Sequence, residues 1–269
     1  MLGIRTESLR SQSMHQWERA EIARSSVEAT RTADRALRVS EATFARYANP
    51  PADTAYPLEY SYHLLGDVSG FRVVDVGCGS GANSVLLAGR GAHVWGVDIS
   101  EDLLRLAARR MTVNGMEGGA TFIASSAHDM PFPDNSIDLV FGIAILHHLD
   151  LDLVSREIRR VLKPGGRAIF KEPVRNSAVV RFLRSLIPYR APDISAFERP
   201  LTDDELQRFA SHFSACSVRA FVLPHVQVGQ VLPLTNKYWR TWYAWDHALL
   251  RRAPRLAHYA AIRVIALTK

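Results

Sequence analysis

"VVDVGCGSGANS", residues 73–84, is the stretch that decides how the chain folds. Its first residues are apolar and β-branched, and they predict a buried strand that breaks into three glycines, Gly77, Gly79 and Gly81. Glycine lets a backbone approach a ligand closely, and the apolar residues after the turn predict a helix whose first N–H groups point back toward it. The same spacing also satisfies a dinucleotide-binding fingerprint, so the turn alone leaves the ligand open.

Length and composition fit one large globular domain, or one domain with a small appendage. The chain has 269 residues, of which 47% are hydrophobic and 22% charged. It contains no leader-like N-terminal segment and no apolar run of membrane-spanning length, so we expect a cytoplasmic protein. Cys78 and Cys216 are too few for a disulfide framework and lack metal-ligand spacing, so we expect no bound metal.

Strand and helix patterns alternate after residue 70, which predicts a mostly parallel sheet with helices on both faces. The chain before it is helical in pattern, with an apolar stripe that begins at Ala33 and ends before Asn49-Pro50-Pro51. Ser100 is expected to cap a helix over 101–115, and a capping box opens another helix at residue 202. A further helix is predicted over 153–162. The predicted strands are 71–76, 93–100, 120–125, 137–145, 167–172, 217–223 and 259–269.

Two aspartates narrow the choice of ligand. Asp98 follows the second strand, where a carboxylate can accept hydrogen bonds from ribose hydroxyls in adenosine cofactors and in dinucleotides alike. Asp75 comes just before the glycine turn, where it suits a cationic ammonium and sulfonium but would repel a pyrophosphate. Either aspartate, taken alone, is equally typical of a helix cap, and the glycines alone are equally typical of a tight turn.

The motifs after the second predicted strand resemble those of a known family. The stretch "SSAHDMPFPDNSIDLVFGIAILHHL" and the later "VLKPGG" resemble the class I S-adenosylmethionine-dependent methyltransferases, in particular the small-molecule group that includes the ubiquinone- and menaquinone-biosynthesis enzymes. The resemblance covers residues 60–175. It implies an α/β fold with a Rossmann-like, seven-stranded, mostly parallel sheet whose last strand is antiparallel. We expect an N-terminal helical lid over 1–66 and a cofactor-binding domain over 67–269, with insertions at about 173–200 and 224–258.

The resemblance implies S-adenosyl-L-methionine as the cofactor and assigns contacts to its methionine and ribose parts. Gly77, Cys78 and Gly79 would pass their backbone beneath the methionine. Asp75 would hold the ammonium group, directly or through water. Asp98 would bind both ribose hydroxyls.

The adenine and the methyl group have their own implied contacts. Ser126 stands where the family usually has an aspartate, so the adenine amino group would be held by this hydroxyl or by Asp129. The other implied contacts are Ile99, Ala127 and His128 for the adenine, and Gly142 and Ile143 for the methionine carboxylate and the methyl group.

Two residues are candidates for catalysis. His147 follows the fourth strand, close to the implied methyl group, and its imidazole suits proton removal from a hydroxyl at neutral pH. His148 beside it would line the substrate pocket, and Glu172 is a second candidate base. The competing interpretations are a helix cap or pocket wall for His147, and an ion pair with Lys171 or an arginine for Glu172. We expect an oxygen acceptor on a small, apolar molecule, with carbon and nitrogen as alternatives.

Nucleic-acid substrates are disfavoured. Enzymes that methylate adenine or glutamine usually place Asn-Pro-Pro-Tyr after the fourth strand, where this chain has residues 142–145, "GIAI". That loop also lacks the cysteine of the covalent cytosine mechanism. A dinucleotide-dependent oxidoreductase and a cofactor-binding protein without turnover stay open as rivals.

The C-terminal segment has an unusual charge and aromatic content. Residues 236–269 carry seven lysines and arginines against the single acid Asp246. Trp239, Trp242 and Trp245 recur every third residue and indicate one helical stripe. The stripe is expected to pack a lid, to wall an apolar substrate pocket or to rest on an anionic membrane surface.

Overall fold

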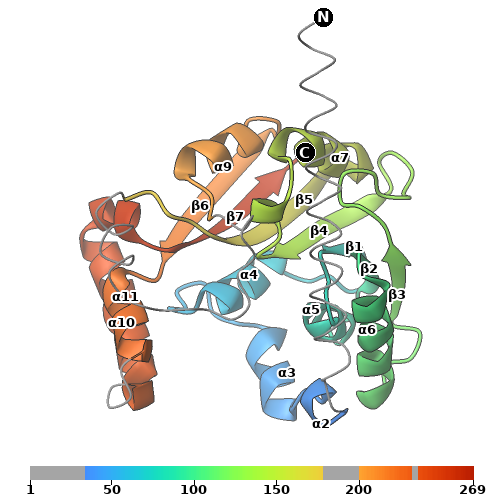
Figure 1. Cartoon of the computed structure of the whole chain (residues 1–269), viewed down its shortest axis with the longest axis horizontal. Coiled ribbons are helices and arrows are strands. Elements are labelled where there is room, and N and C mark those ends of the chain that lie inside the picture. Colours follow the sequence, from blue (N-terminus) through green and yellow to red (C-terminus); the bar gives the residue numbers. More distant parts are fainter. Residues whose placement is uncertain (1–33, 178–199, 232–235) are drawn as a thin grey trace, which may run out of the picture.

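The computed structural model describes residues 34–177, 200–231 and 236–269, which are built around one seven-stranded sheet (Figure 1). The strand order is β3-β2-β1-β4-β5-β7-β6, so the direction of progression reverses between β1 and β4. Open α/β sheets bind ligands at such a switch point, beyond the carboxyl ends of the strands. The strands are β1 (Arg72–Val76), β2 (His93–Asp98), β3 (Ala120–Ala124), β4 (Ile137–Ile143), β5 (Leu162–Pro173), β6 (Ala215–Phe221) and β7 (Ile262–Thr268).

Strand directions confirm the predicted fold class. Neighbouring strands from β3 to β5 are parallel, and β7 runs antiparallel to both β5 and β6. The last strand is therefore the antiparallel one, as expected. Val73 of β1 pairs with Val94 of β2 and with Leu139 of β4, which aligns the three carboxyl ends at one edge.

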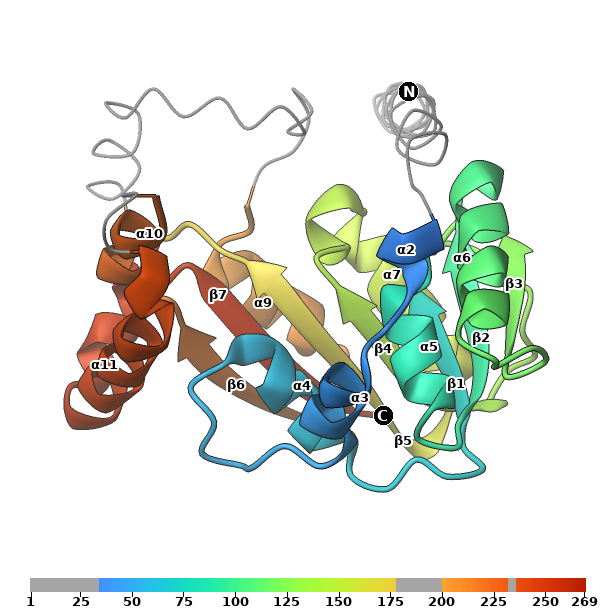
Figure 2. The ribbon, with the colours of Figure 1, turned by 90° about the horizontal axis from the view of Figure 1, so that it is seen from below.

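Helices cover both faces of the sheet (Figures 1 and 2). Leu65 and Leu87 pack α4 and α5 on one face, while Ile158 and Phe209 pack α7 and α9 on the other. The helices are α2 (Asp34–Leu37), α3 (Glu41–Ala48), α4 (Pro57–Leu65), α5 (Ala82–Ala88), α6 (Glu101–Val113), α7 (Leu151–Val161), α9 (Asp203–Ala210), α10 (Pro224–Val231) and α11 (Trp239–Arg252). Three 3₁₀ turns are η1 (Leu146–His148), η2 (Asn236–Tyr238) and η3 (Pro254–Tyr259). None of the helices within the described residues has the length and apolar character needed to cross a membrane.

The predicted capping residues lie at the helix ends where the sequence indicated them. Ser100 caps α6 by accepting a hydrogen bond from the Leu103 N–H, and the capping box at Thr202 and Glu205 is formed. Helix α6 ends just before Gly115, whose φ of +68° is the left-handed conformation that stops helices.

The start of β5 differs from the prediction. The helix expected over 153–162 ends at Val161, and the strand expected from residue 167 begins at Leu162. Leu162 pairs with Ile137, and the ladder resumes at Arg167 after a register shift. Residues 163–166 therefore bulge out of an already extended strand, and Gly165, at φ +73°, allows the bulge.

Arg90, in the turn between α5 and β2, ties the N-terminal helices to the rest of the fold. Ser40 breaks the expected stripe and caps α3 separately from α2. Arg90 donates to the carbonyl oxygens of Tyr47, Tyr62 and Gly66, all in or next to these helices. Much of the expected lid and of the first insertion, residues 1–33 and 178–199, lies outside the described residues, so the domain boundaries stay a proposal.

Candidate functional site

The glycine turn carries the chain from β1 into α5 at the switch point. The N–H groups of Gly77 and Cys78 both donate to the Val97 carbonyl of β2. A methyl group on Gly77 would lie 2.5 Å from Ile145 Cδ1, and the residue has a φ of +66°. Only glycine meets both demands here, because the loop after β4 presses directly against the turn.

Asp98 braces this turn from the end of β2. Its Oδ2 accepts the Gly79 N–H at 2.9 Å, and its Oδ1 accepts the Ser100 N–H at 2.9 Å. Ile99 follows it, half-buried. The structure thus brings together the glycines and the aspartate that the motifs predicted on neighbouring strands.

Asp75 lies buried beneath the turn. Ser84 Oγ donates to its Oδ2 at 2.6 Å. Burial raises the pKa of the Asp75 carboxyl to about 7, the hydrogen bond from Ser84 lowers it, and the nearby Asp98 raises it further. Asp75 is therefore a carboxyl whose charge is poorly compensated by the described protein groups around it.

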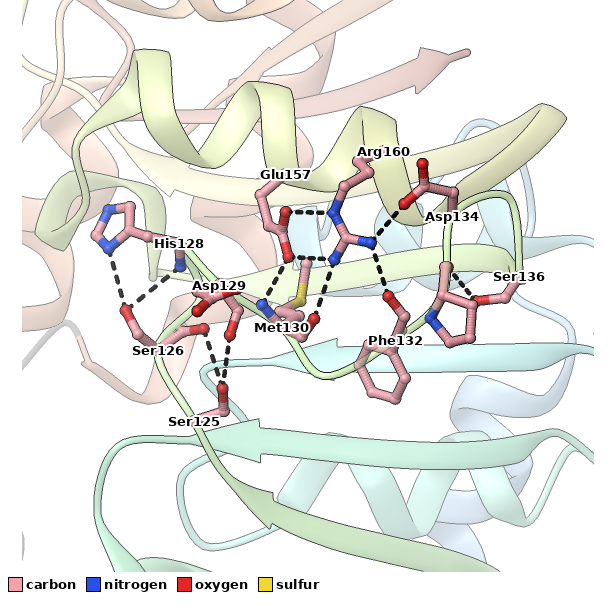
Figure 3. A network of polar contacts seen from close by, with 11 residues as sticks. Ser125, Ser126, His128, Asp129, Met130, Phe132, Asp134, Ser136, Glu157 and Arg160 are labelled. Carbon is pink, nitrogen blue, oxygen red and sulfur yellow. Dashed lines mark hydrogen bonds and ion pairs between the residues drawn. The ribbon is translucent and has the colours of Figure 1, made fainter.

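The loop after β3 holds the predicted adenine contacts in a polar network (Figure 3). Asp150 N–H donates to His128 Nε2, so Nδ1 carries the proton that it donates to Ser126 Oγ at 3.1 Å. The His128 N–H also donates to Ser126 Oγ, at 3.3 Å. Ala127 lies buried between these two residues. The Ser126 hydroxyl accepts twice from His128, and its own proton can be donated to another acceptor.

Glu157 and Arg160 of α7 support the same loop and were not predicted. Glu157 Oε1 accepts the Met130 N–H at 2.6 Å, and Arg160 donates to the Met130 and Phe132 carbonyls and to Asp134 (Figure 3). Their spacing of three residues on an amphipathic helix showed that they share a face, but not what that face contacts.

The end of β4 turns sharply beside the glycine turn. Gly142 packs so closely under Phe170 that an added methyl group would lie 2.5 Å from the ring. Ile143 is half-buried and ends the strand. Ala144 then adopts a φ of +57°, an uncommon left-handed conformation for a residue with a side chain. The strained residue turns the chain toward η1 and its two histidines.

His147 and Glu172 form a buried pair across β4 and β5. His147 Nδ1 lies 2.9 Å from Glu172 Oε2, and because a carboxylate only accepts, Nδ1 carries the proton. Glu172 Oε1 accepts the N–H groups of Ile145 and Leu146 at 2.8 and 2.9 Å. One carboxylate therefore fixes both the 3₁₀ turn and the ring of His147, and in this tautomer Nε2 is the ring nitrogen that carries no proton.

The pair changes the interpretation of Glu172. The expected alternative was an ion pair with Lys171 or an arginine, but the Glu172 carboxylate is bonded to η1. Lys171 precedes it on β5, and burial lowers the pKa of the Lys171 ammonium group. His148 stacks beside His147 with ring centroids 4.0 Å apart.

The three tryptophans are not brought to the histidines. They lie on α11, which packs beyond β6 at the end of the sheet farthest from β3 (Figure 1). Trp239 contacts Tyr56 at a ring-centroid distance of 5.4 Å, Trp242 packs on Gly229, and Trp245 points outward, 56% exposed. A shared role in one substrate pocket stays a prediction.

Both cysteines are free thiols, and possible metal ligands do not cluster in the described part of the chain. Cys78 is buried in the turn, where burial raises the pKa of its thiol, and Cys216 is an exposed free thiol on β6. Across residues 34–177, 200–231 and 236–269, no group of three or more potential ligands (His, Cys, Asp or Glu) is arranged to hold a metal ion.

The strand order and directions define a Rossmann-like α/β protein whose glycine turn lies at the β1/β4 switch point. Residues 74–170 match the family model described as a methyltransferase domain. The chain is 33% identical over 153 residues to a fatty-acid O-methyltransferase from Mycolicibacterium smegmatis, covering 56% of this chain and 49% of that protein. It is 35% identical over 119 residues to a ubiquinone/menaquinone-biosynthesis C-methyltransferase from Pseudomonas putida, covering 42% and 46%.

Among solved structures, a geranyl diphosphate C-methyltransferase from Streptomyces coelicolor A3(2) shares the fold, with a TM-score of 0.54 and 17% identity over 77% of this chain and 78% of that one. It was solved with Mg²⁺, geranyl diphosphate and S-adenosyl-L-homocysteine. The chain spans less than half the length of the curated relatives that it matches. Residues 74–170 therefore resemble a methyltransferase domain, and the predicted resemblance to small-molecule S-adenosylmethionine-dependent methyltransferases is confirmed.

Proposed function

We propose that this chain transfers a methyl group from S-adenosyl-L-methionine to an oxygen of a small, fairly apolar molecule. The observation that carries the proposal is the His147–Glu172 pair. His147 follows β4 within the residues that match the methyltransferase-domain model, and Glu172 lies on β5, two residues beyond them. An oriented imidazole at that position suits an acceptor that must lose a proton, such as a hydroxyl group.

The residues around the turn fit the cofactor. The backbone of Gly77 to Gly79 offers close approach to the methionine part, and Asp98 offers carboxylate oxygens at the end of β2 for the ribose. The poorly compensated carboxyl of Asp75 suits the ammonium group, since a cation nearby would stabilise its charged form. These residues would bind the cofactor, which supplies an activated methyl group on a sulfonium.

Adenine recognition is assigned to the loop after β3. The Ser126 hydroxyl accepts two hydrogen bonds from His128, so it suits donation to an adenine ring nitrogen better than acceptance from the amino group. Ile99 and Ala127 would supply apolar contacts, and Asp129 is the better candidate for the amino group.

The proposed chemistry is a displacement with one proton transfer. A bond forms between the acceptor oxygen and the methyl carbon, the sulfur–carbon bond breaks, and the hydroxyl proton passes to His147 Nε2. Glu172 would keep the ring in the tautomer whose Nε2 accepts, and would stabilise the imidazolium that forms. Gly142 and Ile143 would lie beside the reacting methyl group, and His148 beside the acceptor.

The relatives bear on the acceptor without fixing its atom. One is named for O-methylation of fatty acids and others for C-methylation in ubiquinone/menaquinone biosynthesis or of geranyl diphosphate. The molecules in these names share a long apolar part, which favours an apolar substrate here. Carbon methylation is the second candidate, because two of the three proteins carry it in their names.

Methyl transfer from radiolabelled S-adenosyl-L-methionine into an extract of the source cells tests the proposal. The wild type should label a compound in the organic phase, and His147→Ala should label it far more slowly. Release of labelled methanol in mild base identifies a methyl ester, release of methyl iodide in hydriodic acid identifies a methyl ether, and label that survives both treatments is not bound to oxygen. Label in protein or nucleic acid would refute the substrate class. A carbon-bound methyl group would replace the oxygen acceptor, and S-adenosyl-L-homocysteine binding without any label would favour a non-catalytic role.

A further inference from the structure

Exposed apolar side chains gather on the two helices at the far end of the sheet. Of the seven large hydrophobic residues that are exposed in the described part of the chain, five lie in residues 224–259. We call the outer face of α11, with its neighbour on η2, the α11 surface. It comprises Tyr238, Trp245 and Leu249, which are 53, 56 and 43% exposed.

The apolar residues of the α11 surface form one stripe. Tyr238, Trp245 and Leu249 are spaced by seven and four residues, which places them on the same side of the helix. The inner edge of Trp245 meets the Trp242 ring at a centroid distance of 5.4 Å, and Trp242 packs against Gly229 of α10. The Trp245 side chain is therefore held in place by Trp242, which in turn packs on α10.

The opposite side of α11 is anchored to the sheet. Asp246 is buried and accepts the backbone N–H groups of Val222 and Leu223, at 2.9 and 2.6 Å. Trp239 and Tyr243 both contact Tyr56, which precedes α4. These contacts fix which side of the helix faces outward (Figures 1 and 2).

The exposed charged residues of the segment 236–269 are all basic. Five basic residues of this segment are exposed, while its acid, Asp246, is buried. The other two bases counted in the sequence belong elsewhere, since Arg263 pairs with Asp203 and Lys269 donates to Asn135 and to the Leu162 carbonyl. The five exposed bases are Lys237, Arg240, Arg251, Arg252 and Arg255.

We propose that the α11 surface docks this protein onto a lipid bilayer that contains anionic headgroups. A helix lying in the interface plane would bury Tyr238, Trp245 and Leu249 among the headgroups and upper acyl chains, and aromatic rings with a polar edge favour that depth. The arginines and Lys237 would attract anionic lipid phosphates. A second copy of this surface is a poorer partner, because five like charges would face five. The proposal does not depend on methyl transfer.

Vesicle co-sedimentation of the full chain tests the docking. The wild type should bind vesicles of equal phosphatidylglycerol and phosphatidylcholine, bind pure phosphatidylcholine weakly and be released by 0.5 M salt. Replacing Trp245 and Leu249 with serine removes two large apolar contacts and should weaken partitioning by roughly ten-fold or more. Arg251→Gln with Arg252→Gln should lower binding to the anionic vesicles by roughly 30-fold, because each basic residue near the surface is attracted to anionic lipid.

A matched control separates docking from general surface change. Leu153 on α7 is 38% exposed, close to the 43% of Leu249, so Leu153→Ser should bind as the wild type does. Equal binding by the Trp245→Ser, Leu249→Ser variant, with an unchanged melting temperature, would overturn the proposal. So would the absence of wild-type binding to anionic vesicles. A lipid-free dimer that this variant converts to a monomer would also overturn it, in favour of self-association.

Discussion

Two buried aspartates, Asp75 under the glycine turn and Asp246 on α11, contrast the two ends of the sheet. Asp246 accepts two backbone N–H groups from the end of β6, and these bonds fix a helix to a strand. Asp75 accepts one side-chain hydrogen bond, from Ser84 of α5. Its burial raises the pKa of its carboxyl group to about 7, and the nearby carboxylate of Asp98 contributes to the rise. A buried charge that the fold compensates holds structure together, whereas one that the fold leaves poorly compensated suits a ligand of opposite charge.

Strand β5 lies between the two regions, and it carries Glu172. A substitution at Glu172 is expected to have the largest effect. Glu172→Gln keeps a carbonyl oxygen for the Ile145 and Leu146 N–H groups but replaces the acceptor of His147 Nδ1–H with a donor. We expect kcat to fall by about 100- to 10,000-fold, as for loss of a general base, while S-adenosyl-L-homocysteine affinity stays within about two-fold. Steady-state kinetics and calorimetry measure the two quantities.

The double variant Glu172→Gln, His147→Ala identifies the route of the effect. If Glu172 acts through His147, the double variant should be no slower than the slower single variant, because both remove one unit. If the losses of kcat in the two single variants add up in the double variant, Glu172 does not act through His147. If Glu172→Gln lowers the affinity for S-adenosyl-L-homocysteine as much as it lowers kcat, the residue only supports the fold.

Gly77→Ala should change only the proposed cofactor site at the glycine turn. The new methyl group would lie 2.5 Å from Ile145 Cδ1 at a φ of +66°, so the loop after β4 must move away from the turn. Overpacking and left-handed strain together cost about 3 kcal/mol, and we expect S-adenosyl-L-homocysteine affinity to fall by roughly 100-fold by calorimetry.

Gly70→Ala is the control for Gly77→Ala. Gly70 has a similar φ of +72°, but nothing lies within 4 Å of an added methyl group. It should pay the left-handed strain in stability and bind the ligand normally. Equal affinities in the two variants would show that the close contact between the turn and the loop has no role in binding.

Asp246→Ala should change only the contact between α11 and the chain that follows β6. Two buried N–H groups would lose their acceptor, and the unfolding free energy should fall by about 2 kcal/mol in urea titration, after a small gain from the helix propensity of alanine. Thr241→Ala, at an exposed position of the same helix, should change stability little. A drop in S-adenosyl-L-homocysteine affinity in Asp246→Ala would contradict the independence of the two ends.

The same contrast explains how far the sequence could be interpreted. In the cofactor half, contacts join neighbouring strands in one βαβ unit, as between Gly79 and Asp98, so ordered motifs predict the site residues and their proximity. At the other end, Asp246 contacts a strand end 24 residues away and Arg219 donates to the carbonyl of Thr54, 165 residues away. The helical spacing of the tryptophans was evident, but which side of α11 faces inward depends on such contacts.

The His147–Glu172 pair lies between these extremes. Each residue was predicted from its place after a strand, and β4 and β5 are neighbours in the sheet. Their hydrogen bond was not predicted, because it requires the left-handed turn at Ala144, and a φ of +57° at an alanine has no sequence signal. Strained positions of this kind are where local propensity is expected to fail.

The smallest expected effect is a pH dependence that Asp75 should give to ligand binding. Its folded-state pKa of about 7 lies above the usual value of 3.8, so between those two pH values the folded protein holds a proton that the unfolded chain has lost. The contribution of Asp75 to folding stability therefore falls as the pH rises through that window. A ligand ammonium group binds the charged carboxylate, so binding below pH 7 must release this proton. S-adenosyl-L-homocysteine affinity should weaken by up to about ten-fold per pH unit below 7 in the wild type. Asp75→Asn has no proton to release, and its weaker affinity should be nearly flat from pH 5.5 to 8. Parallel pH profiles of the two proteins would mean that Asp75, like Asp246, serves only the fold.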